Sequence, residues 1–127
     1  MDGCPFCRRT EVESIAQNRW AIAFHDGFPV SRGHSLVIPR RHVRSVFELS
    51  PDEYASVWAL VGEVREKLLL EFQPAAFNIG VNDGTAAGQT VSHAHIHVIP
   101  RFSGDVVDPR GGVRWVIPSK ADYWSKA

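Results

Sequence analysis

Residues 89–99 read Gln-Thr-Val-Ser-His-Ala-His-Ile-His-Val-Ile. His93, His95 and His97 alternate here with apolar residues. Successive side chains of a β-strand point to opposite faces of the sheet, so the pattern places three imidazoles on one face and three apolar groups on the other. The stretch therefore predicts a strand from Val91 to Ile99 with one histidine-lined face.

This histidine face has three interpretations. It can be the solvent-exposed side of an edge strand, although three histidines in strict alternation are rare on a random surface. It can bind a metal ion through an adjacent pair, but not through all three, because the Cα atoms of His93 and His97 would lie about 13 Å apart. It can also be catalytic, with neutral imidazoles acting as nucleophile and hydrogen-bonding partners near pH 7.

Other segments of the chain complete an antiparallel sheet. Short apolar runs bounded by turn residues predict further strands at Arg19–Phe24, Ser35–Ile38, Phe77–Val81 and Val113–Ile117. The turn residues Asn82-Asp83-Gly84, followed by Gly88, predict a hairpin of Phe77–Val81 against Thr90–Ile99.

One long helix is expected between the second and third of these runs. Ser50 can cap it, Pro51 suits its first position, and Glu53 completes a capping box. Apolar residues then recur at three- and four-residue steps until Pro74, at Tyr54, Val57, Trp58, Val61, Val64, Leu68 and Phe72. The fold class is therefore α+β, an antiparallel sheet of about five strands with one long helix.

Composition limits the classes of function. The 127 residues are 44% hydrophobic and 22% charged, which suits one domain over 1–127. A net charge of zero argues against binding a nucleic acid polymer, and no apolar run is long enough to span a membrane. Two cysteines are too few for a secreted disulfide framework, and the first residues resemble no signal peptide. We expect a cytoplasmic protein.

Residues 89–99, together with other matches in the same order, resemble the histidine triad (HIT) family. The further matches are Phe24-His25-Asp26, Gly33-His34-Ser35-Leu36-Val37-Ile38-Pro39, Asn82-Asp83-Gly84 and Gly88-Gln89. The resemblance runs from Cys4 to about Arg101. It implies a HIT core over about 1–101 and a C-terminal tail over about 102–127 that packs on the core or on a dimer partner.

The resemblance implies chemistry at the α-phosphate of a nucleotide. His95 would attack the phosphorus to form a covalent nucleotidyl-histidine that water then cleaves. His97 and His34 would lie near the phosphate, and Gln89 would donate hydrogen bonds to its oxygens, so that no catalytic metal is required. His34 after a glycine is equally expected as a hydrogen-bonded histidine at the start of a strand.

The nucleotide-binding residues also come from the resemblance. Asp26 would accept hydrogen bonds from ribose hydroxyls, and Asn82 would lie at the mouth of the same pocket. The backbone of Gly88 and Thr90, around Gln89, would place donors on the phosphate oxygens. Phe24 could line the base pocket, or it could simply belong to the core of a buried strand. Asn82 in an Asn-Asp-Gly turn is equally expected for backbone reasons.

Cys4-Pro5-Phe6-Cys7 has three interpretations of its own. A glutaredoxin-type redox pair needs a preceding strand, for which three residues are too few. A pair of reduced surface thiols is the plain alternative. A HIT subgroup with this N-terminal motif is similar, and the similarity implies a structural zinc bound by Cys4, Cys7, His42 and His93.

The leading hypothesis is a HIT-type hydrolase of dinucleoside polyphosphates, such as diadenosine tetraphosphate, or of nucleoside phosphoramidates. The alternatives are a nucleotidyltransferase or phosphorylase that uses the same intermediate, and a nucleotide-binding regulatory protein without catalysis. The resemblance also implies a homodimer whose two sheets join edge to edge, near the long helix. His25 and the segment Gly111–Pro118 remain without an assigned role.

Overall fold

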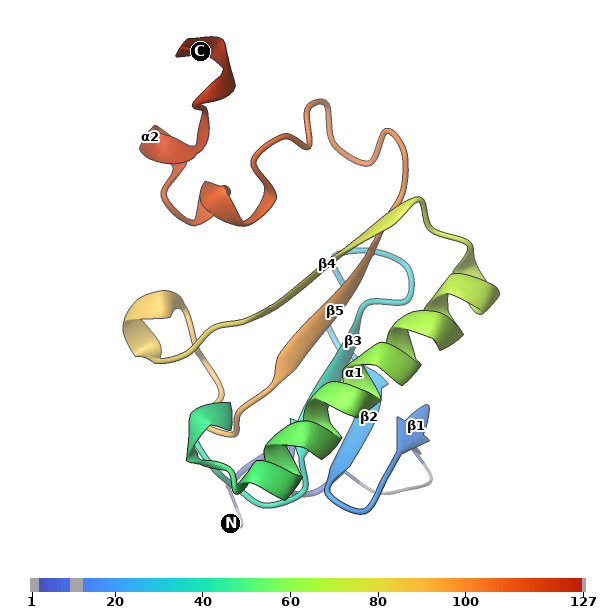
Figure 1. Cartoon of the computed structure of the whole chain (residues 1–127). Helices are drawn as coiled ribbons and strands as arrows, with labels where there is room; N and C mark the ends of the chain where they lie inside the picture. Colours follow the sequence, from blue (N-terminus) through green and yellow to red (C-terminus); the bar gives the residue numbers. More distant parts are fainter. Residues whose placement is uncertain (1–2, 10–12, 127) are drawn as a thin grey trace.

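The computed structural model describes residues 3–9 and 13–126, and it has the expected α+β architecture. Five strands form one antiparallel sheet in the order β1-β2-β3-β5-β4 (Figure 1). The strands are β1 (Ala16–Gln17), β2 (Ala21–His25), β3 (Ser35–Pro39), β4 (Ala76–Val81) and β5 (Ile96–Arg101). No helix in the described ranges has the length and apolar character needed to cross a membrane.

Helix α1 (Pro51–Phe72) begins and ends where its sequence predicts. The Ser50 hydroxyl accepts from the Glu53 amide at 3.2 Å, and the Glu53 carboxylate accepts from the Ser50 amide at 3.0 Å. This capping box satisfies two amides that the first helical turn leaves without partners. Gln73 then adopts a left-handed conformation with φ of 52°, and Pro74 cannot continue the helix.

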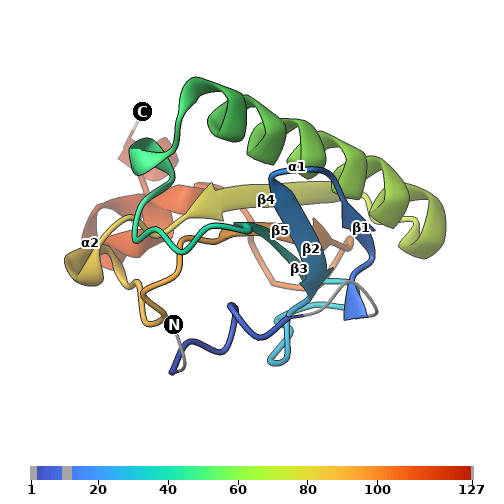
Figure 2. The same ribbon diagram turned by 90° about the horizontal axis from the view of Figure 1, so that it is seen from below.

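The helix covers one face of the sheet, and the N-terminal segment lies against the other (Figure 2). The main core forms under α1, where Ile96 and Val98 of β5 are fully buried with Val57 and Leu68 of the helix. On the opposite face a smaller apolar group is buried, and Phe6 packs against it. This group consists of Ile22, Phe24, Leu36 and Ile38. His93 and His95 contact Phe6 and therefore lie on this second face, away from the helix, whereas the ring of His25 lies 6.2 Å from that of Phe72 at the end of α1.

The histidine strand is shorter than the alternation predicts. β5 begins at Ile96; of the predicted strand residues before it, 91–93 form bends and 94–95 have no regular secondary structure. Within this stretch the amide of Ala94 donates to the carbonyl of Val43 at 2.8 Å, so the chain bonds to the segment after β3 instead of extending the β4–β5 ladder. Ala94, Ile96 and Val98 nevertheless all enter the main core, so the alternating faces persist.

The predicted strand Val113–Ile117 is wrong. Residues Gly112–Val116 form the 3-10 helix η4, followed by the short helix α2 (Pro118–Ala121) and the 3-10 helix η5 (Trp124–Lys126). Gly111 and Gly112 have φ values of 92° and 44°, which turn the chain out of an extended path. The fifth strand is β1, which has only two residues and no alternation long enough to mark it.

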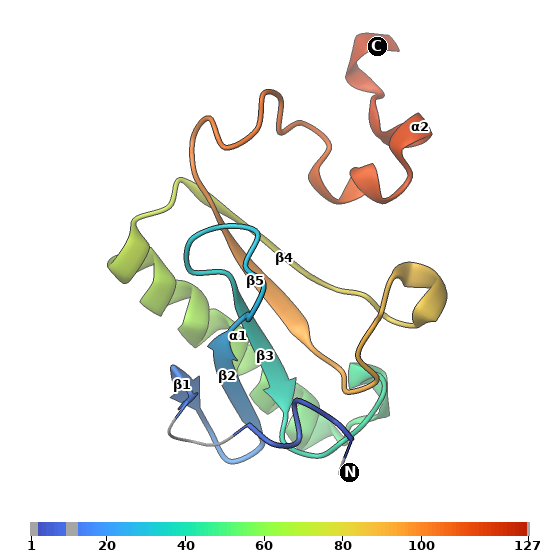
Figure 3. The same ribbon diagram turned by 180° about the vertical axis from the view of Figure 1, so that it is seen from behind.

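The segment after β5 runs beyond the end of the sheet and turns back toward β4 (Figures 1 and 3). If a Cβ atom were added to Gly112, it would lie 3.4 Å from the Nδ2 atom of Asn78 on β4. This close approach brings the C-terminal segment next to the sheet. The division into a core over 1–101 and a tail over 102–127 remains a prediction.

Candidate active site and metal cluster

The three predicted catalytic histidines meet where β3 begins beside β5. Leu36 of β3 pairs with His97 of β5, and this register brings His34, just before β3, alongside His97. The Nε2 atom of His34 lies 2.9 Å from the Nδ1 atom of His97. The His95 and His97 rings lie 5.2 Å apart between centroids. The structure thus gathers His34, His95 and His97 into one cluster.

Hydrogen bonds assign the protons of His34 and His97. The amide of Val30 donates to Nδ1 of His34 at 3.1 Å, so a neutral His34 carries its proton on Nε2 and donates it to Nδ1 of His97. Burial lowers the pKa of His34, and burial together with neighbouring imidazoles lowers the pKa of His97 to about 4. Both rings are therefore neutral at pH 7, and His97 keeps one hydrogen on Nε2.

The position of the proton on His95 follows from a backbone carbonyl. Its Nδ1 atom lies 2.9 Å from the carbonyl oxygen of His93, which can only accept a hydrogen bond. Nδ1 therefore carries the proton, and Nε2 keeps its lone pair. The ring is only 8% exposed, and the edge-on ring of Phe6 lies 5.1 Å from it between centroids. This arrangement holds an unprotonated ring nitrogen in a fixed direction.

Asp26 lies beside His34, directly after β2. Its Oδ2 atom is 3.4 Å from Nε2 of His34, and its Oδ1 atom accepts from the amide of Phe28 at 2.8 Å. Asp26, His34 and His97 also place one ligand atom each within 4.8 Å of one another. The carboxylate predicted to bind ribose is therefore next to the catalytic cluster.

Gln89 braces the loop between β4 and β5. Its side-chain oxygen accepts from the amide of Gly84 at 2.9 Å, and its amide nitrogen donates to the carbonyls of Arg44 at 2.9 Å and Val91 at 3.0 Å. All of these contacts are internal to the protein. Gln89 thus orders the loop in this structure, and hydrogen bonding from its side chain to a phosphate stays a prediction.

The other predicted binding residues occupy the same loop. A Cβ atom added to Gly88, whose φ is 100°, would lie 3.9 Å from the side-chain nitrogen of Asn82, which places these two residues together. Thr90 instead lines a hollow that also contains Cys4 and His42. The structure therefore places Thr90 near two residues of the metal cluster.

Phe24 is buried, with 1% exposure, and the N-terminal segment covers it. Phe6 packs on it edge-on at 5.5 Å, and the guanidinium of Arg9 lies 4.3 Å from its ring centroid. Sequence reasoning missed Phe6 and Arg9, because their positions between and after the two cysteines carry no periodic signal. His25 serves the fold, since its Nδ1 atom bonds the Ser35 hydroxyl at 3.0 Å.

Cys4, Cys7, His42 and His93 form the cluster that the sequence predicts. Each offers one ligand atom, and all four atoms lie within 4.8 Å of one another. The Cys7 sulfur lies 3.2 Å from Nδ1 of His42 and 3.5 Å from Nδ1 of His93, and the Cys4 sulfur lies 3.5 Å from Nδ1 of His93. A tetrahedral zinc site with ordinary bond lengths separates sulfur from nitrogen by roughly 3.5 Å. The four residues could therefore hold a metal ion.

Surrounding bonds orient these four residues as ligands. Nε2 of His93 donates to the carbonyl of Pro39 at 2.7 Å, which leaves the lone pair of Nδ1 facing the sulfurs. The amide of Cys7 donates to the Cys4 sulfur at 3.4 Å. Burial and the adjacent Cys4 raise the pKa of the Cys7 thiol, so a cation would be needed to hold the Cys7 sulfur as a thiolate at pH 7.

Comparison with known proteins decides the family. The sequence model of the HIT domain matches residues 9–104. The chain belongs to the HIT family. A Schizosaccharomyces pombe bis(5'-nucleosyl)-tetraphosphatase (asymmetrical) is 39% identical over 89 residues, which cover 70% of this chain and 49% of that protein. An adenosine 5'-monophosphoramidase from the same organism is 34% identical over 102 residues, or 77% of this chain and 74% of that protein.

Solved structures of HIT proteins share the fold. A HIT family protein from Bacillus anthracis superposes with a TM-score of 0.75 at 34% identity, over 82% of this chain and 77% of that one. A Zn-bound histidine triad family protein from Mycobacterium smegmatis superposes with a TM-score of 0.74 at 31% identity, over 84% of this chain and 81% of that one. The expected HIT-like fold is thus confirmed.

Proposed function

We propose that this HIT protein is a nucleotide hydrolase that cleaves at the α-phosphate through a covalent intermediate on His95. The observation that carries the proposal is the hydrogen bond from Nδ1 of His95 to the His93 carbonyl, which leaves the lone pair on Nε2. The named HIT relatives act as a tetraphosphatase and a phosphoramidase, which supports dinucleoside polyphosphates and nucleoside phosphoramidates as the substrate classes.

The reaction has two displacements at one phosphorus atom. In the first, the lone pair of Nε2 forms a bond to the α-phosphorus, and the bond to the leaving group breaks with its electron pair. A nucleoside triphosphate leaves as a stable anion and needs no proton, whereas the nitrogen of a phosphoramidate takes up a proton from solvent and leaves as the neutral amine. In the second, water attacks the phosphorus, the P–N bond breaks, and the pair returns to Nε2 while one water proton goes to solvent. Two easier steps thus replace one difficult step.

Neighbouring groups assist by hydrogen bonding. The remaining hydrogen on Nε2 of His97 is a donor for a phosphoryl oxygen, and His34 holds that ring in place through Nδ1. Asp26 is the acceptor for ribose hydroxyls, and Phe24 contributes to the wall for the base. Asn82, Gly88, Gln89 and Thr90 complete the loop around the site in this proposal. A catalytic metal has no step in this scheme.

Zinc is the metal that suits the second cluster, because two sulfurs and two imidazoles are its preferred ligands. When bound, zinc supplies a structural cross-link between the N-terminal segment and the sheet. His93 is then held two residues before the nucleophile, which leaves His95 and His97 for the phosphate. We also propose a homodimer, because the outer side of β4 offers an edge that a second copy can pair. The cytoplasmic location is proposed on the composition of the sequence, which has too few cysteines for a secreted disulfide framework.

Turnover of diadenosine tetraphosphate and adenosine 5'-phosphoramidate by the purified chain tests this function. We expect adenosine monophosphate from both substrates. We expect His95→Asn to lose turnover by on the order of 10⁴-fold or more, while binding is retained. His25→Asn is the matched control, since His25 contacts Ser35 outside the cluster. Equal turnover by His95→Asn and the wild type would refute the assignment.

The same assay separates the alternatives. Inorganic phosphate added as a competing acceptor yields a nucleoside diphosphate if the protein is a phosphorylase, and this product is absent if water alone is the acceptor. Binding without any turnover, identical in the wild type and His95→Asn, is the result expected of a regulatory protein.

A further inference from the structure

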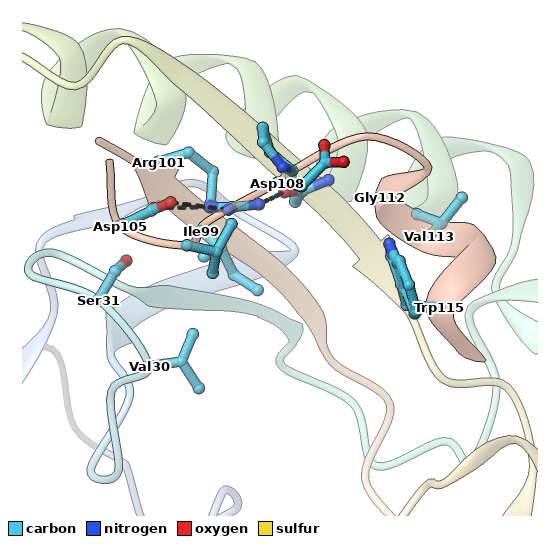
Figure 4. A pocket seen from close by; sticks show the side chains of 12 residues that line it. Val30, Ser31, Ile99, Arg101, Asp105, Asp108, Gly112, Val113 and Trp115 are labelled. Atoms are coloured by element: carbon cyan, nitrogen blue, oxygen red, sulfur yellow. Dashed lines mark hydrogen bonds and ion pairs between the residues drawn. The ribbon is translucent and has the colours of Figure 1, made fainter. Parts of the chain in front are cut away.

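A cavity of about 540 Å³ lies between the sheet and the C-terminal segment (Figure 4). Its floor includes Ile99 of β5 and Asn78 of β4, which pair across the sheet. Side chains alternate along a strand, so Ile99 lies on the same face as His97 and about 7 Å farther along it. The cavity is therefore a continuation of the histidine face.

The loop that holds His34 forms one wall of this cavity. Val30 and Ser31 line the wall. The Val30 amide donates to Nδ1 of His34 at 3.1 Å, and the Ser31 hydroxyl donates to the carbonyl of Pro100 at 2.7 Å. These bonds tie the wall to His34 on one side and to β5 on the other.

The opposite wall is the segment whose role the sequence leaves open, with Val113 and Trp115 on η4 (Figure 4). The indole nitrogen of Trp115 donates to the carbonyl of Arg110 at 2.8 Å. A Cβ atom on Gly111 would lie 3.2 Å from that nitrogen, and the φ of 92° at Gly111 also favours glycine. The two glycines thus bring an aromatic ring and a branched side chain against the sheet.

The charges in the cavity are paired. The guanidinium of Arg101 bonds both oxygens of Asp105 at 2.8 and 2.9 Å and donates to the Asn78 side-chain oxygen at 2.6 Å. Asp108 pairs with Arg110 at 2.9 Å. The site therefore presents apolar and aromatic surface with a few polar groups and no excess positive charge. Such a site suits an uncharged ring rather than phosphates.

We propose that this cavity binds the second nucleoside of a dinucleoside polyphosphate, an inference that rests on the proposed function. With the α-phosphate at His95, the polyphosphate spans the sheet face and the leaving nucleoside enters the cavity. Its base packs on Trp115 and the apolar walls, while Ser31 and Asn78 offer polar contacts. A substrate with a small leaving group does not reach the cavity. The C-terminal segment thereby favours dinucleotide substrates.

A cavity-filling substitution tests this subsite. Val113→Trp places a bulky ring in the cavity, and Val116→Trp makes the same change at a residue of η4 that does not line the cavity. We expect Val113→Trp to lower kcat/KM for diadenosine tetraphosphate about tenfold or more, the loss expected when base stacking is blocked. The value for adenosine 5'-phosphoramidate stays within twofold, and Val116→Trp leaves both values unchanged.

Binding to proteins that also carry His95→Asn separates the subsite from turnover. By calorimetry, Val113→Trp should weaken diadenosine tetraphosphate about tenfold and leave adenosine monophosphate unchanged. This result supports the subsite even if the wild type cleaves neither substrate, an outcome that would refute only the proposed function. Equal effects of Val113→Trp on both ligands, or no effect on diadenosine tetraphosphate, would overturn the subsite.

Discussion

Backbone carbonyls give identical residues in the histidine stretch different chemical roles. The His93 carbonyl accepts a hydrogen bond from Nδ1–H of His95, which leaves the lone pair of that ring on Nε2. The Pro39 carbonyl accepts a hydrogen bond from Nε2–H of His93, which leaves the lone pair of that ring on Nδ1, facing the cysteine sulfurs. One ring is thereby prepared as a nucleophile and the other as a metal ligand.

Much of the cluster could be predicted at the level of single residues. The motif named His34, His95 and His97, and the structure gathers them. The motif could not show that the Gln89 side chain forms its hydrogen bonds within the loop region. Its partners are the backbone amide of Gly84 and the backbone carbonyls of Arg44 and Val91, and the identity of a side chain does not reveal where backbone groups lie. Backbone geometry decides this, and only the folded chain supplies it.

The lowered pKa of His97 predicts a loss of stability in mild acid. The ring has a pKa of about 4 when folded, against its ordinary value of 6.5, so the unfolded chain binds more protons between these values. Its contribution to stability is complete above pH 6.5 and is lost as the pH falls toward 4. From pH 7 to pH 5 the free energy of unfolding should fall by on the order of 1 kcal/mol more in the wild type than in His97→Asn.

Urea unfolding at both pH values measures this difference. His25→Asn, which replaces a histidine that contacts Ser35 outside the cluster, should keep the wild-type loss. An identical acid response in His97→Asn and the wild type would show that His97 is not held neutral.

At the scale of elements, the sheet and α1 could be predicted because their signals are local. The capping box marks the start of α1, a short apolar run bounded by turn residues marks β3, and alternation marks β5. β1 has two residues, too few to show alternation, and the glycines at 111 and 112 convert an apparent strand into η4. The missed elements are those that depend on contacts with distant residues or on positive φ values.

The N-terminal segment should depend on zinc for its attachment. Protein purified without chelator should contain about one zinc per chain, and Cys7→Ser should lose it, because the remaining three ligands leave the tetrahedral site open. Chelation should lower Tm by roughly 5 °C or more, because bound metal stabilises only the folded state. His25→Asn should keep the metal. Zinc far below one equivalent in the wild type would contradict the proposed site.

At the scale of the whole molecule, the β4 edge points to assembly. β4 is the last strand of the sheet, and no described strand pairs with its outer side. Exposed strand edges pair readily with a second chain. The homodimer predicts a light-scattering mass of about twice 14.2 kDa at micromolar concentration. A mass near 14.2 kDa under these conditions would instead show a monomer.

The central claim is that His95 carries the nucleotidyl group, and the stereochemical course at phosphorus tests it most directly. The substrate is a dinucleoside polyphosphate with a chiral thiophosphate at the α-position, hydrolysed in water enriched in oxygen-18. Each in-line displacement inverts the phosphorus, so two displacements through His95 predict a nucleoside thiophosphate with overall retention. Overall inversion would mean that water attacks the substrate directly, and it would contradict the covalent intermediate.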